Sequence, residues 1–277
     1  MTNVVIGAGS GMGTAVARVL APRGELIVAD QNREAVAALA AELGGAVAPV
    51  ACDITAREQI DALVARIGTL EAIVLTAGLS GSMANGRRIF EVNLIGTARV
   101  LEAVEPLLRP GTVGVCFASM SGYRVPDRPE LMAILDDPLS DRFFDAFVEL
   151  GLDPDAPQLA YPVSKRGIHR LVRRLCPSWG ARGARIMSVS PGINDTPMNR
   201  LDESRHSIMA DIIKSSPLGR RGRPEEVANV VEFLTSDKAS FMTGSDVLVD
   251  GGMVATIPED TTGGRVSSSS ESGPGLA

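Results

Sequence analysis

The sequence predicts an α/β protein with a doubly wound parallel sheet that carries helices on both faces. Two observations support this fold class: short β-rich apolar runs alternate with longer segments of helical periodicity, and a glycine-rich turn follows the first apolar run. This alternation is typical of repeated strand–helix–strand units, in which a crossover helix makes successive strands parallel. With 277 residues the chain is long enough for a full core, and we expect one domain over residues 1–257.

The elements follow one another in a regular order. The short apolar runs predict strands at residues 4–6, 25–29, 46–51, 72–75, 114–118, 184–190 and 245–249. The segments with helical spacing predict helices at residues 12–20, 33–43, 57–67, 93–108, 161–181 and 225–234.

Two segments break this rhythm. Residues 123–160 contain acidic and proline-containing stretches, and apolar patterns at 130–135 and 142–150 predict two short helices within them. Residues 258–277 consist largely of Gly, Ser, Thr and Glu with almost no apolar content, which predicts a disordered tail.

Composition and charge exclude several classes of function. A net charge of −6 argues against nucleic acid or an anionic membrane as the main partner. No apolar run reaches the roughly 18 residues of a membrane span, and the N-terminus does not resemble a signal peptide. Cys52, Cys116 and Cys176 are expected to be small buried residues, and with only two histidines no metal site is expected. His169 is expected on a helix surface and His206 in a loop. We therefore expect a cytoplasmic protein.

The glycine-rich turn predicts a phosphate-binding loop. Gly7, Gly11 and Gly13 follow the pattern Gly-x-x-x-Gly-x-Gly between the first strand and the first helix. Glycine is needed where the backbone turns tightly and a pyrophosphate approaches a helix N-terminus. The alternative interpretation is an ordinary strand–helix turn.

An acidic residue after the second strand favours NAD(H) over NADP(H). Asp30 lies 17 residues after Gly13, where a carboxylate can accept hydrogen bonds from ribose hydroxyls and repel a 2′-phosphate. Arg33 is close enough to leave NADP(H) open, with a surface charge as the alternative. Asp53, after the third strand, is expected either to contact adenine or to cap a helix.

A tyrosine and a lysine on one predicted helix suggest acid/base chemistry. Tyr161 precedes Lys165 by four residues, so the two side chains share a helix face. A neighbouring cation favours phenolate and lowers the tyrosine pKa toward working pH, as a general acid/base requires. The alternative is an ordinary pair on a helix surface.

Together with Asn93 and Ser119, these features resemble the short-chain dehydrogenase/reductase family. The segments 190–198, 217–228 and 243–252 also resemble its C-terminal motifs, so that the resemblance covers about residues 3–255. It implies a Rossmann fold and a nicotinamide cofactor. The implied cofactor-binding residues are Gly7, Ser10, Gly11, Met12, Gly13, Asp30, Gln31, Asp53, Ile54, Ala77, Gly78, Tyr161, Lys165, Pro191, Gly192, Ile193 and Thr196.

The resemblance also implies a catalytic role for four residues. Tyr161 exchanges the proton with the substrate oxygen, and Lys165 lowers its pKa and holds the nicotinamide ribose. Ser119 donates a hydrogen bond to the substrate oxygen, with Ser121 as its rival. Asn93 holds a water through which Lys165 reaches solvent, with a helix N-cap as the alternative role.

The sequence departs from the family pattern in places. Ile6 and Thr76 stand where the family usually has Thr and Asn. Ser119 and Tyr161 are 42 positions apart because residues 123–160 form an insertion. The insertion resembles one in bacterial 3α-hydroxysteroid dehydrogenase/carbonyl reductase, where it alters the usual tetramer interface. Here it is expected to be a lid over the substrate, a subunit contact, or both.

The expected function is NAD(H)-dependent interconversion of a secondary alcohol and a ketone. The expected substrate is an apolar small molecule, with cyclic and steroid-like compounds among the candidates. The family resemblance also implies a homo-oligomer, either a dimer or a tetramer. One alternative is an NAD-binding regulator without turnover. Another is enoyl reduction or sugar epimerisation, against which the Tyr161–Lys165 spacing argues.

Overall fold

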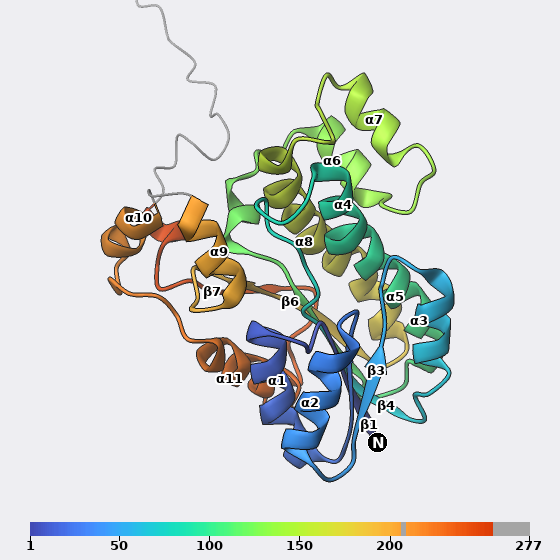
Figure 1. The fold of residues 1–277 in the computed structure, drawn as a ribbon. Coiled ribbons are helices and arrows are strands. Elements are labelled where there is room, and N and C mark those ends of the chain that lie inside the picture. Colours follow the sequence, from blue (N-terminus) through green and yellow to red (C-terminus); the bar gives the residue numbers. More distant parts are fainter. Residues whose placement is uncertain (206–208, 257–277) are drawn as a thin grey trace, which may run out of the picture.

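The computed structural model describes residues 1–205 and 209–256, and they form a parallel sheet covered by helices (Figure 1). Its seven strands are hydrogen-bonded in the order β3-β2-β1-β4-β5-β6-β7. Their bounds are β1 Thr2–Ile6, β2 Glu25–Asp30, β3 Val47–Ala51, β4 Leu70–Leu75, β5 Val113–Phe117, β6 Arg185–Pro191 and β7 Asp246–Val249. The doubly wound α/β fold predicted from the sequence is confirmed.

The strand order creates a crevice at the carboxyl end of the sheet. The chain runs outward from β1 to β3, returns to β4 on the other side of β1, and then continues outward to β7. At the end of β1, Ile6 is paired with Ala29 of β2 and Leu75 of β4. Connections leave this point in opposite directions, which is where doubly wound sheets bind their ligands.

Helices cover both faces of the sheet (Figure 1). One core lies under α1 (Gly11–Leu20), α2 (Arg33–Leu43) and α11 (Pro224–Leu234). The other lies under α3 (Arg57–Val64), α5 (Thr97–Val104) and α8 (Pro157–Ala181).

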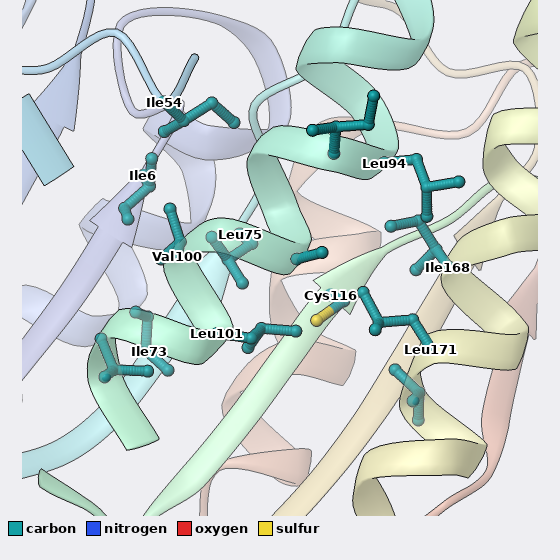
Figure 2. Close-up of a cluster of buried hydrophobic side chains, with 14 of the residues drawn as sticks. Ile6, Ile54, Ile73, Leu75, Leu94, Val100, Leu101, Cys116, Ile168 and Leu171 are labelled. Atoms are coloured by element: carbon teal, nitrogen blue, oxygen red, sulfur yellow. The ribbon is translucent and has the colours of Figure 1, made fainter. Parts of the chain in front are cut away.

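The side chains of successive strand residues pack into opposite cores. Val4 packs in one core and Val5 in the other, as the alternation of side chains along a strand requires. Figure 2 shows part of the core under α3, α5 and α8, with Cys116 of β5 near Leu101 and Leu171. Burying each such aliphatic side chain contributes about 1.5–3 kcal/mol. Cys52 and Cys116 are buried as predicted, whereas Cys176 is half-buried.

The helix predicted at residues 93–108 begins seven residues earlier than expected. Asn85 caps it by accepting a hydrogen bond from the Arg88 backbone N–H, and α4 (Gly86–Phe90) continues into a π-helical turn, Glu91–Gly96, before α5. The cap was missed because its partner groups are backbone atoms. The helix predicted at 161–181 likewise begins at Pro157, in the first helical turn where proline is tolerated.

Other boundaries also differ from the sequence prediction. The helix predicted at 57–67 ends at Val64. Two further helices, α9 (Pro197–Arg205) and α10 (Met209–Ser215), occupy a region that lacks a clear apolar periodicity.

The insertion folds onto its own chain. Its two predicted helices are present as α6 (Pro129–Asp136) and α7 (Phe143–Glu149). Phe143 and Phe147 are buried against Phe90 of α4, with ring centroids 5.5 and 4.9 Å from that ring. Arg170 of α8 forms a two-pronged ion pair with Asp136.

Arg170 therefore joins α8 to the insertion. Within the described ranges, none of the helices combines the length and the apolarity that crossing a bilayer requires. The predicted disordered tail at 258–277 lies outside those ranges.

Candidate active site

The glycine turn after β1 is a tight cradle. Gly7 and Gly11 have φ values of +88° and +55°, which favour glycine. A Cβ atom at Gly13 would lie 2.0 Å from the carbonyl oxygen of Gly7, and one at Gly7 would lie 2.3 Å from the backbone nitrogen of Ala77. Side chains are therefore excluded from the loop, so that a ligand can approach its backbone at the N-terminus of α1.

The carboxylate of Asp30 faces this turn. It accepts hydrogen bonds from the backbone N–H groups of Gly9 and Asn32, at 3.0 and 2.9 Å. The cleft here has a volume of about 480 Å³. It is lined by Gly7, Ser10, Gly11, Met12, Gly13, Asp30, Thr76, Ala77, Gly78, Thr196, Pro197 and Met198.

A second cleft of about 470 Å³ contains the predicted catalytic residues. Its lining comprises Met12, Thr76, Gly78, Leu79, Phe117, Ala118, Ser119, Tyr161, Lys165, Pro191, Gly192, Thr196, Met198 and Asn199. Met12, Thr76, Gly78, Thr196 and Met198 line both clefts, so the two adjoin. Together they form an elongated groove with the glycine cradle at one end and Tyr161 at the other.

Lys165 is buried at the floor of this groove. Its ammonium donates a hydrogen bond to the Phe117 carbonyl at the end of β5, with 2.9 Å between the atoms. Burial lowers the pKa of Lys165 to about 8, so the amine is still mainly protonated at pH 7.

The Tyr161 phenol does not have the lowered pKa that the sequence predicted. Burial raises its pKa, the side-chain hydrogen bond with Ser119 opposes that rise, and the Asp202 carboxylate adds to it. The Lys165 ammonium is directed at the Phe117 carbonyl instead. In the structure without ligands, the expected lowering by Lys165 is therefore absent.

The structure distinguishes Ser119 from its rival Ser121. Ser119 lines the groove beside Tyr161, whereas Ser121 does not. Both the backbone N–H and the hydroxyl of Ser121 donate to the Ser119 hydroxyl oxygen, at 3.2 and 3.0 Å. Ser121 thus fixes the orientation of Ser119 and does not face the cleft itself.

Asn93 lies within the π-helical turn, so the predicted alternative of a helix N-cap is wrong. Its amide pairs with the backbone of Leu79: Oδ1 accepts from the N–H at 2.7 Å and Nδ2 donates to the carbonyl at 2.9 Å. Nδ2 also donates to the Ser164 hydroxyl at 3.2 Å. A Cβ atom on Gly78 would lie 3.3 Å from both the Asn93 oxygen and the Lys165 amine, so Gly78 provides the space between them.

Thr76 stands where the family usually has Asn, and its hydroxyl braces the end of β4 against the glycine turn. Its hydroxyl lies 2.9 and 3.0 Å from the carbonyl oxygens of Ile6 and Gly7 and donates to them. It therefore ties the end of β4 to the glycine turn. Thr76 also lines both clefts and was not among the predicted site residues, because its role depends on a strand that lies 70 positions earlier in the chain.

A comparison with known families decides the classification. The sequence profile described as "Enoyl-(Acyl carrier protein) reductase" matches residues 7–135 and 154–254, which is most of the chain. The chain belongs to the short-chain dehydrogenase/reductase family. The unmatched residues 136–153 lie inside the predicted insertion and include α7.

Several curated dehydrogenases are similar to this member of the short-chain dehydrogenase/reductase family over nearly their whole length. The short-chain dehydrogenase/reductase bsc3 of Alternaria brassicicola is 32% identical, over 94% of this chain and 98% of its own. The cyclohexanol dehydrogenase of Acinetobacter sp. (strain SE19) is 33% identical, over 90% and 92%. The 3-alpha-hydroxysteroid dehydrogenase/carbonyl reductase of Comamonas testosteroni is 28% identical, over 92% and 96%.

A solved structure shows the same fold. The 3-ketoacyl-(acyl-carrier-protein) reductase from Brucella melitensis, complexed with NADH, matches with a TM-score of 0.72 at 23% identity and covers 91% of this chain and 98% of that one. The family membership and the dehydrogenases and reductases among the relatives make this chain an oxidoreductase.

Four predicted cofactor residues lie away from the groove. Gln31 is exposed, and the Ile54 side chain is buried in the core against Gly96. Ile193 lines a neighbouring hollow on the other side of Gly192. The fourth is Asp53.

Asp53 neither lines the groove nor caps α3, whose N-cap is Ala56. Its carboxylate accepts from the backbone and the hydroxyl of Thr55, and it forms an ion pair with Arg88 at 3.1 Å. Burial would raise the Asp53 pKa, but these hydrogen bonds outweigh it and the pKa is lowered.

The mouth of the groove is formed by α9, which contributes Met198 and Asn199. A hydrogen bond of 2.7 Å from the buried Ser80 hydroxyl to the Asp202 carboxylate ties α9 to the segment after β4. No residue of the insertion, which was expected to be a lid, a subunit contact or both, lines the groove among the described residues.

The prediction of a helix-surface position for His169 is wrong, because its side chain is only 4% exposed. His206 lies outside the described residues. In the part of the chain that the structure describes, no three His, Cys, Asp or Glu side chains gather as metal ligands would.

Proposed function

We propose that this protein interconverts a secondary alcohol and a ketone with NAD(H) as the cofactor. The observation that carries the proposal is the groove itself. One end is a glycine cradle closed to side chains, and the other brings Ser119, Tyr161 and Lys165 together. A dinucleotide is long enough to need both ends, and its reactive ring must lie beside the proton donor.

The residues present fit a bound nicotinamide cofactor. The backbone of the cradle would receive the pyrophosphate at the N-terminus of α1, and Pro191, Gly192 and Thr196 would surround the nicotinamide. When bound, the nicotinamide supplies or accepts the hydride.

The protein moves the proton. In ketone reduction, Tyr161 donates its phenolic proton to the substrate oxygen, and Ser119 stabilises the charge that develops there through a hydrogen bond. Lys165 would hold a ribose hydroxyl of the bound cofactor, and its ammonium charge would then favour the phenolate that remains. Asn93 anchors the end of β4 against the helix that begins at Gly86, which keeps open the space at Gly78 beside the Lys165 amine.

Asp30 supports NAD(H) over NADP(H). Its carboxylate lies in the cofactor end of the groove, where a 2′-phosphate would meet a like charge. Arg33, the residue that kept NADP(H) open, lines a different groove, with Pro49 and Glu58.

The substrate end favours an apolar substrate. Leu79, Phe117 and Met198 contribute apolar surface around Ser119 and Tyr161. The similarity to a cyclohexanol dehydrogenase and to a hydroxysteroid dehydrogenase supports a cyclic alcohol or ketone.

The test is the initial rate with NADH and with NADPH against aliphatic, cyclic and steroid ketones, together with a crotonyl thioester for enoyl reduction. Tyr161→Phe should abolish ketone reduction. Ser119→Ala should lower kcat about 100-fold or more, as the loss of an oxyanion donor does. Ser121→Ala is the matched control and should lose far less.

Two outcomes would redirect the proposal. A Tyr161→Phe protein with full turnover would refute the proposed chemistry. NADH binding without turnover of any compound would favour the alternative of a cofactor-sensing regulator.

A further inference from the structure

A cluster of buried polar side chains lies behind the groove and has no role in the chemistry above. His169, Ser188 and Ser190 are 4%, 0% and 0% exposed. The His169 Nε2 atom lies 2.8 Å from the Ser190 hydroxyl and 3.5 Å from the Asp246 carboxylate. Ser188 donates to the same carboxylate at 2.5 Å, and the Tyr123 hydroxyl donates to it at 2.7 Å.

Three residues of this cluster lie close in the sequence to residues of the groove. His169 lies one helical turn after Lys165 on α8. Ser190 directly precedes Pro191 at the end of β6. Tyr123 belongs to the 3₁₀ turn Met120–Arg124, whose N-cap is Ser119.

The imidazole also fixes the distance between α8 and the turn that follows Ser119. A Cβ atom at Gly122 would lie 2.9 Å from His169 Cε1, so the turn that follows Ser119 packs directly on the ring. The rings of Tyr123 and His169 meet edge to face, with centroids 5.0 Å apart. The cluster therefore joins the catalytic helix, the serine turn and the nicotinamide strand through one side chain.

Stability is a poor explanation for such a cluster. Buried polar groups are expensive to desolvate, and an apolar packing of the same volume is often at least as stable. What hydrogen bonds add is direction, because they fix one arrangement among several that would pack equally well.

We propose that His169 is a positioning residue that, through Ser190 and the Asp246 carboxylate, holds the Pro191–Gly192 segment and the Ser119 turn in register with the helix of Tyr161 and Lys165. This inference rests on the proposed function for its effect on turnover. The imidazole touches neither the groove nor the reacting atoms. It acts through the elements that carry those residues.

The imidazole must be neutral to do this. The pKa of His169 is lowered to about 4, mainly by burial; the Asp246 carboxylate on β7 opposes this shift, and Arg166, Arg173 and Lys165 on its own helix add to it. Between pH 6 and 9 the His169 imidazole therefore stays neutral.

The experiment compares four variants with the wild type. His169→Gln keeps a side-chain nitrogen that can reach Ser190, whereas His169→Leu keeps volume and loses the hydrogen bond. Ser190→Ala removes the other partner. Arg174→Ala, an exposed position on the same helix, is the control.

Two measurements are made. Hydrogen–deuterium exchange of the ligand-free proteins reports the order of residues 119–124 and 188–196. Single-turnover hydride transfer from NADH to the best ketone reports the alignment of the groove.

We expect His169→Leu and Ser190→Ala to speed exchange in these two segments but not elsewhere. Hydride transfer should slow about tenfold or more in His169→Leu, and His169→Gln should recover most of it. Arg174→Ala should match the wild type in both measurements.

The proposal is overturned if exchange in the two segments is unchanged in His169→Leu and Ser190→Ala, or if it rises equally throughout the chain. It is also overturned if His169→Gln is as slow as His169→Leu. A wild type that turns over no ketone would refute the proposed function, and the exchange comparison, which needs no substrate, would still decide whether His169 positions the two segments. If His169→Leu does not fold, Ser190→Ala and His169→Gln carry the test.

Discussion

The carboxylate of Asp30 accepts a hydrogen bond from the backbone N–H of Gly9, with 3.0 Å between the two atoms. A Cβ atom at Gly9 would lie 2.8 Å from the Asp30 carboxyl carbon, so the strand end and the cradle fit closely together. The bond holds one carboxylate oxygen toward the cofactor end of the groove. In the proposed function, Asp30 is the residue that sets cofactor preference.

We therefore expect Asp30→Ala to weaken NADH binding about tenfold to a hundredfold, the effect of losing a hydrogen bond to a charged group. Affinity for NADPH should rise relative to NADH, because a like charge near the 2′-phosphate has been removed. Titration of NADH and NADPH fluorescence measures both affinities. Glu34→Ala, an exposed carboxylate on α2, is the control, and an unchanged NADH preference in Asp30→Ala would contradict the assignment.

Lys165→Met should abolish turnover yet stabilise the ligand-free protein. Burial lowers the Lys165 pKa from 10.5 to about 8, which corresponds to a folded-state penalty on the order of 3 kcal/mol. Losing the hydrogen bond to the Phe117 carbonyl offsets about 1–2 kcal/mol of that gain. The free energy of unfolding at pH 7 should therefore rise by roughly 1–2 kcal/mol, as urea denaturation can measure.

The pH dependence of this gain has a definite sign. The unfolded lysine binds its proton up to about pH 10.5, whereas the folded one releases it near pH 8. The penalty on the wild type is therefore complete below pH 8 and disappears as the pH rises to 10.5. A stability difference that grew over this range would show that Lys165 is not held charged in an unfavourable site.

Asp202→Asn should lower the pH at which alcohol oxidation becomes half-maximal. After burial, the Asp202 carboxylate is a cause of the raised Tyr161 pKa, because a negative charge disfavours the phenolate. Asparagine keeps an acceptor for the Ser80 hydroxyl and removes the charge. We expect the profile of kcat/KM against pH to move down by up to about one unit.

The matched control for this shift is Asp195→Asn, which removes an exposed carboxylate from the same segment. It should leave the profile in place. An upward shift in Asp202→Asn would mean that the carboxylate acts on Tyr161 by something other than its charge.

Phe147→Ala tests the role of the insertion. Phe147 is fully buried against Phe90 and Phe143, so truncation should reduce the free energy of unfolding by about 3–5 kcal/mol. The KM for the ketone should stay within twofold at a temperature where the variant is folded, because the groove is lined by other residues.

Val148→Ala, at a neighbouring position that is 58% exposed, should change neither property. A tenfold rise in KM for the folded Phe147→Ala protein would restore the lid interpretation. The present packing supports an insertion that stabilises α4 and α8 from outside the site.

The parts of the site that could be predicted from the sequence are those in which local spacing decides the geometry. The glycine cradle, and the side-by-side placement of Tyr161 and Lys165 in the groove, follow from residues within one turn or one helix of each other. Asp30 could be placed because the second strand lies next to the first in folds of this class, so the end of the second strand lies beside the glycine turn.

The errors concern side chains whose partners are distant in the sequence. Asp53 does not line the groove and is paired with Arg88, 35 positions later. His169 is buried because Asp246 and Ser190 come from two strands that had no visible connection with it. The Tyr161 pKa depends on burial and on Asp202, which the sequence did not place near the phenol.

The π-helical turn Glu91–Gly96 restricts how the gene can change in length. Successive residues of a helix are rotated by about 100°, so deleting one residue here would turn everything before it by that angle. Phe90 would leave the aromatic cluster of the insertion, or Asn93 would leave the end of β4. A change of length here therefore costs one of these two contacts, whereas residues 136–153 are unmatched by the family profile and do not line the groove.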